Sequence, residues 1–128
     1  MTGNIGLEVI SAPILKKLDE IQKLLNEVYS LLPPQNKWRA QIEKAKLNFE
    51  ILADRIKEFA ASKKNKNGLE ILDFNELLEE VLAEIKLLNQ KELSLKLGNL
   101  LTGDLEKAMN KLNLKLASLE GEIKRFVG

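Results

Sequence analysis

Four segments of the chain repeat apolar residues at alternating steps of three and four, and this pattern limits the fold more than any other feature. A sustained repeat of about 3.5 residues keeps one stripe of a helix facing a neighbouring helix along its length. No charged residue interrupts any of the stripes, which we call seams. The seams, in chain order, are Ile14-Leu18-Ile21-Leu25-Val28-Leu32, Trp38-Ile42-Ala45-Phe49-Leu52-Ile56-Phe59, Phe74-Leu78-Val81-Ile85-Leu88 and Leu105-Met109-Leu112-Leu116-Leu119-Ile123-Phe126. Because four seams can cover one another, we predict a single all-α domain over residues 1–128, an antiparallel up-down-up-down four-helix bundle.

Residues that start and stop helices set the predicted boundaries. Pro13, shortly after Ser11, is expected in the first turn of the first helix, where proline is tolerated. The prolines at 33–34 end that helix, and Gly68 ends the loop after the second. Asp73 with Glu76 resembles the capping pair that opens a helix. The predicted helices are 11–32, 37–62, 73–90 and 103–127.

Charge favours contact between the second and third helices. Residues 36–68 carry nine basic and four acidic side chains, whereas residues 69–92 carry two basic and seven acidic ones. Opposite charges on neighbouring helices favour one register, although each exposed pair contributes only about 0–1 kcal/mol.

One segment does not follow the helical pattern. Within the connector 91–102, the residues from Leu93 to Leu97 alternate between apolar and polar, as a strand does. A lone strand has no partner in a helical chain. A short helix and an extended connector both remain open.

The absence of two residue types limits the chemistry. The chain has no cysteine and no histidine, which excludes thiol nucleophiles and removes the usual neutral-pH acid–base group and the commonest metal ligand. A di-metal bundle built on the carboxylates of 76–84 would also need Glu-x-x-His pairs. No glycine-rich phosphate loop is present. We therefore predict a non-enzyme with no catalytic residue, metal, cofactor or small-molecule substrate.

The chain lacks the apolar run of about 18 residues that a membrane-spanning helix requires, and its N-terminal residues do not form a signal peptide. We expect a cytoplasmic location, with peripheral association at a membrane as the alternative. The net charge of +1 and the lack of interleaved aromatic residues disfavour nucleic-acid binding.

Several apolar residues fall outside the seams and are candidates for partner binding. Leu47 and Ile51 lie four residues apart on the back of the second helix, and are therefore neighbours on its surface. Leu87 and Leu114 are similarly placed on the third and fourth helices. Three interpretations remain open. The residues form a docking or self-association patch, they are ordinary exposed residues, or a slightly different helix rotation buries them.

A second candidate surface is basic. Antiparallel order brings the start of the first helix, the loop after the second and the C-terminus to one end, which we call the basic pole. Anionic lipid headgroups could bind there, at about 1 kcal/mol per basic residue. The other interpretation is that these are loop lysines that only keep the chain soluble. Glu122 lies at the same end and weakens the positive electrostatic field there. The residues are Lys16, Lys17, Lys63, Lys64, Lys66, Lys124 and Arg125.

The function predicted from these features is a protein–protein interaction or scaffolding module, part of a larger protein, that binds another protein or a copy of itself. The alternative is a bundle that engages anionic membranes through the basic pole, as the N-terminal bundles of cell-death proteins do. The architecture alone does not choose between them.

Overall fold

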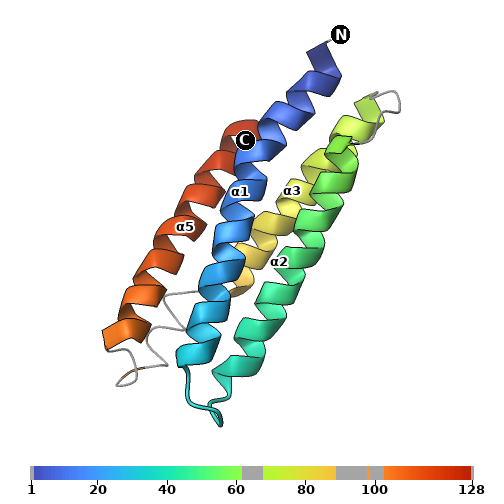
Figure 1. Cartoon of the computed structure of the whole chain (residues 1–128). Coiled ribbons are helices and arrows are strands. Elements are labelled where there is room, and N and C mark those ends of the chain that lie inside the picture. Colours follow the sequence, from blue (N-terminus) through green and yellow to red (C-terminus); the bar gives the residue numbers. More distant parts are fainter. Residues whose placement is uncertain (1, 62–67, 89–97, 99–102, 128) are drawn as a thin grey trace.

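The computed structural model describes residues 2–61, 68–88, 98 and 103–127. These residues form four α-helices and no strand, which confirms the predicted all-α class for the described part of the chain. The helices are α1 (Thr2–Leu31), α2 (Trp38–Ala61), α3 (Gly68–Leu88) and α5 (Gly103–Val127). Figure 1 shows them side by side as long rods.

The structure corrects two of the predicted helix starts. α1 begins at Thr2, nine residues before Ser11, so Pro13 lies inside the helix and not in its first turn. α3 begins at Gly68 rather than at Asp73, so Asp73 is an exposed residue within the helix and does not cap it. α2 and α5, in contrast, lie within one residue of their predicted bounds at both ends.

The seams form the hydrophobic core. Every seam residue is buried except Trp38, Phe59 and Phe126, which are partly buried against the core. Phe74 joins the ends of three helices, with its ring centroid 5.5 Å from that of Phe59 and 5.7 Å from that of Phe126. The 3.5-residue repeat therefore predicted most of the core, because it fixes which stripe of each helix faces the others. Ala53, Leu77 and Ala108 are also buried, although they lie outside the seams.

The helices contact one another in a closed order: α1 with α2, α2 with α3, α3 with α5, and α5 with α1. The α1–α5 side therefore lies across the bundle from the α2–α3 side (Figure 1). Polar pairs between neighbours run in opposite order along the two helices. They are Lys17 with Glu122 and Glu20 with Lys115 on α1 and α5, and Arg55 with Glu80 and Asn48 with Glu84 on α2 and α3.

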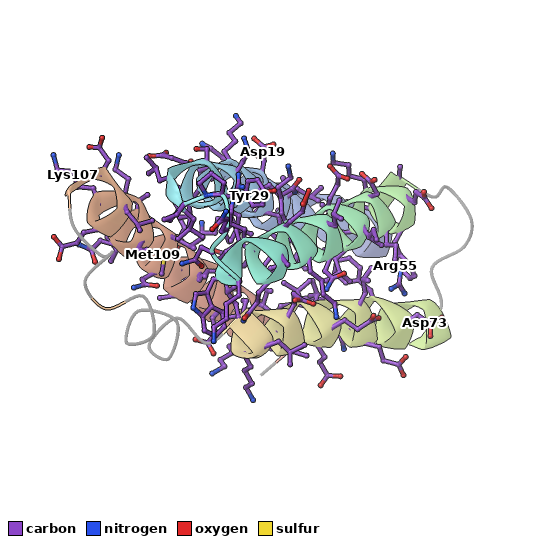
Figure 2. All side chains as sticks on the ribbon, turned by 90° about the horizontal axis from the view of Figure 1, so that it is seen from below. Asp19, Tyr29, Arg55, Asp73, Lys107 and Met109 are labelled. Atoms are coloured by element: carbon purple, nitrogen blue, oxygen red, sulfur yellow. The ribbon has the colours of Figure 1, made fainter. Side chains whose placement is uncertain are left out.

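The turn between α1 and α2 is fixed by side chains at its two ends. Asn36 Oδ1 accepts a hydrogen bond of 2.8 Å from the backbone N–H of Trp38 and so caps α2. The Arg39 guanidinium lies 4.2 Å from the centre of the Tyr29 ring, and it donates to the Tyr29 carbonyl at 3.4 Å. Tyr29 lies where α1 and α2 meet (Figure 2). These contacts hold the second helix against the first from its first turn.

Of the predicted connector 91–102, the structure describes Gly98 alone, and its exposed backbone has a φ of 52°. The strand-like segment from 93 to 97 lies outside the described residues. None of the described helices combines the length and the hydropathy that crossing a membrane requires.

Candidate interaction surface

The four apolar residues outside the seams are all exposed. Their exposed fractions are 48% for Leu47, 56% for Ile51, 71% for Leu87 and 73% for Leu114. A different helix rotation therefore does not bury them. Whether they bind a partner depends on what lies beside each one.

Ile51 and Leu87 line the same groove, although they come from different helices. Three adjoining hollows of about 490, 360 and 200 Å³ follow the junction of α2 and α3. The first two share Arg55 and Glu80, and the last two share Leu87. We call this continuous depression the α2/α3 groove. Leu47 lies one helical turn before Ile51 on α2.

Polar pairs cross the α2/α3 groove and fix its register. Arg55 Nη1 on α2 donates to Glu80 Oε1 at 3.1 Å, and Asn48 Nδ2 donates to Glu84 Oε1 at 3.0 Å. In Figure 2, Arg55 lies at the junction of the two helices, near the end where Asp73 is labelled. The Arg55–Glu80 salt bridge agrees with the predicted attraction between a basic and an acidic helix.

The groove as a whole is acidic. Its basic side chains are Lys44 and Arg55, of which Arg55 is already paired with Glu80. Its acidic side chains are Glu58, Asp73, Glu76, Glu80 and Glu84. A surface with exposed apolar residues and an excess of carboxylates is suited to an apolar partner that carries basic side chains.

Leu114 belongs to a different surface. It lines a hollow of about 340 Å³ between α1 and α5, which we call the α1/α5 groove. Leu24 is the other apolar residue of this groove, and its charged residues are Glu20, Lys23, Lys111 and Lys115. The structure therefore does not gather the four predicted residues into one patch. It places Ile51 and Leu87 in the α2/α3 groove and Leu114 in the groove on the opposite side, while Leu47 is exposed on α2 and lines neither groove.

The described part of the basic pole is partly neutralised. Lys17 lies 3.9 Å from Glu122, and Lys124 lies 3.2 Å from Glu120. Lys16 and Arg125 are exposed. Lys63, Lys64 and Lys66 lie outside the described residues, so their convergence with the others stays a prediction.

The shared groove of Ile51 and Leu87 was not predicted from the sequence. Each comes one residue before a seam residue, Leu52 and Leu88 respectively, and each is therefore displaced to the same flank of its seam. That common offset was a signal for a shared groove. The offset predicts a shared groove only if these flanks of α2 and α3 are known to face each other.

Among the residues that the structure describes, no group of three or more carboxylates could hold a metal ion. No protein-family model, curated protein or solved structure matches the chain.

Proposed function

We propose that the chain is a non-enzymatic protein–protein interaction or scaffolding module. In this proposal it is an antiparallel up-down-up-down bundle that binds a helix of another protein chain in the α2/α3 groove. The opposite order of the polar pairs on α1 and α5 and on α2 and α3 supports the topology.

One observation carries the proposal: exposed Ile51 and Leu87 border one groove that continues along the α2–α3 junction. An amphipathic helix binds such a groove by placing its apolar face against the exposed apolar side chains. Neither residue belongs to the buried core or to the partly buried residues that pack against it. Their exposure therefore leaves them accessible to a partner.

Site-specific photo-crosslinking in cells tests the proposal. A photoreactive phenylalanine analogue at position 51 is expected to form covalent adducts with protein. The same analogue at Ala117, an exposed position on α5 that lines neither groove, serves as the matched control. Equal labelling from both positions would contradict the proposal.

A double substitution tests the same surface by loss of binding. Leu47→Glu with Ile51→Glu places two charges at exposed positions of α2, one of them in the groove and neither in the buried core. The variant should keep the circular dichroism spectrum and thermal midpoint of the parent. When the photoreactive analogue is placed at position 87 instead, the parent should form adducts and the variant should not. Unfolding of the variant would show that these residues support the fold instead.

Membrane engagement through the basic pole is the second candidate, and exposed Lys16 and Arg125 favour it. The salt bridges of Lys17 and Lys124 reduce the charge offered to lipid. Co-sedimentation with vesicles tests it, comparing neutral lipid with a mixture containing anionic lipid. Equal binding to the two would exclude an electrostatic role for the pole.

A further inference from the structure

We infer that the partner of the α2/α3 groove is a second copy of this chain, which inserts the exposed face of its α5. This inference rests on the proposed function and specifies its partner. The face consists of Lys107, Lys111 and Leu114, and we call it the α5 ridge.

The α5 ridge has the composition that the acidic groove requires. Leu114 is its exposed apolar residue, and Lys107 and Lys111 are exposed beside it. Neither lysine forms a salt bridge within the part of the chain that the structure describes. Lys107 projects outward from α5 in Figure 2. The ridge therefore offers an apolar contact with two cations whose charge is not already neutralised by those neighbours.

The two surfaces also match in spacing. On α3, Glu80 and Glu84 are four residues apart, and Leu87 follows three residues later. On α5, Lys107, Lys111 and Leu114 repeat the same spacing with the opposite charge. When an α3 and an α5 from two copies run in the same direction, each glutamate meets a lysine and the two leucines meet. Equal rise per residue keeps the three positions in register.

Ile51 completes the contact from the other wall of the groove. Together with Leu87 it lines the central hollow, so Leu114 of a second copy would lie between two apolar side chains. Glu80 and Glu84 already accept hydrogen bonds from Arg55 and Asn48 respectively. A carboxylate has about four acceptor positions, so each can also accept from an incoming lysine.

The position of the two surfaces determines the kind of assembly. The α5 ridge borders the α1/α5 groove, which lies across the bundle from the α2/α3 groove. A copy that inserts its ridge into one neighbour therefore still offers its own groove to another. Such a head-to-tail contact repeats into an open chain or closes into a ring, unlike a two-fold dimer that uses the same surface twice.

Two single substitutions block the two surfaces separately. Leu87→Glu places a charge in the groove, and Leu114→Glu places one on the ridge. In sedimentation equilibrium at low salt, the mass of the parent is expected to rise with concentration beyond that of two chains. Each variant alone is expected to remain a monomer, because every contact then includes one blocked surface.

Mixing the two variants gives the decisive result. The intact groove of the Leu114→Glu chain should bind the intact ridge of the Leu87→Glu chain, and assembly should stop at two chains. Ala117→Glu, the same kind of change elsewhere on α5, should associate as the parent does. Circular dichroism and thermal midpoints check that all variants are folded.

Three results would overturn the inference: a parent that stays monomeric, a parent that stops at two chains, or a mixture that stays monomeric. The first and third leave the proposed function standing if position 51 still crosslinks to other proteins in cells. Loss of selective crosslinking as well would remove both.

Discussion

A single amide at the α1–α2 turn illustrates how individual residues position the helices. Asn36 accepts the backbone N–H of Trp38, one of the donors that the first turn of a helix leaves without an intrahelical partner. Arg39 then packs on Tyr29 and bonds the Tyr29 and Pro34 carbonyls. The turn after the first helix is thus held by specific side-chain contacts in addition to its prolines.

Asn36→Ala should lower the free energy of unfolding by about 1 kcal/mol, because it removes the capping acceptor. Urea denaturation measures the change. Asn36→Asp, which keeps an oxygen acceptor, should stay close to the parent. If Asn36→Asp lowered the free energy of unfolding as much as Asn36→Ala, the capping hydrogen bond would not be the cause of the loss.

At the scale of the elements, the helices differ in how clearly their ends are marked. α2 follows two prolines and α5 begins at Gly103, whose φ of 56° suits a residue without a side chain. Pro13 gave a misleading signal in α1. Proline commonly marks a first turn, but here it is the twelfth residue of a helix of 30.

Pro13→Ala distinguishes the two placements of the helix start. Inside a helix, proline leaves the carbonyl four residues earlier, that of Val9, without its intrahelical donor, at a cost of about 3 kcal/mol or more. Alanine restores that donor, but it also increases the conformational entropy of the unfolded chain, which offsets part of the gain. We therefore expect the free energy of unfolding to rise by about 1–3 kcal/mol.

Urea denaturation again measures the difference, with Pro34→Ala, outside the helices, as the control that should not stabilise the chain. A Pro13→Ala variant no more stable than the parent would indicate that the helix starts near residue 11 in solution.

At the scale of the whole molecule, the four described helices share one core, and each contacts two neighbours. Detachment of any one helix would expose the seams of the two helices that it contacts. The bundle should therefore unfold as one unit.

The single tryptophan provides a test. Trp38 lies at one end of the bundle and reports on that end by fluorescence, whereas far-ultraviolet circular dichroism reports on all helices. The two urea transitions should coincide. An earlier fluorescence transition would mean that this end opens separately, and would contradict a single cooperative core.

The sequence by itself determined that the chain forms four helices and which stripe of each is buried, because both follow from the local 3.5-residue repeat. The starts of α1 and α3 and the exposure of Leu47, Ile51, Leu87 and Leu114 were settled by the structure. Tertiary structure decided which flanks face each other, and so placed Ile51 and Leu87 in one acidic groove and Leu114 on the opposite side. The repeat fixes each helix's own rotation, but a groove exists only between two helices.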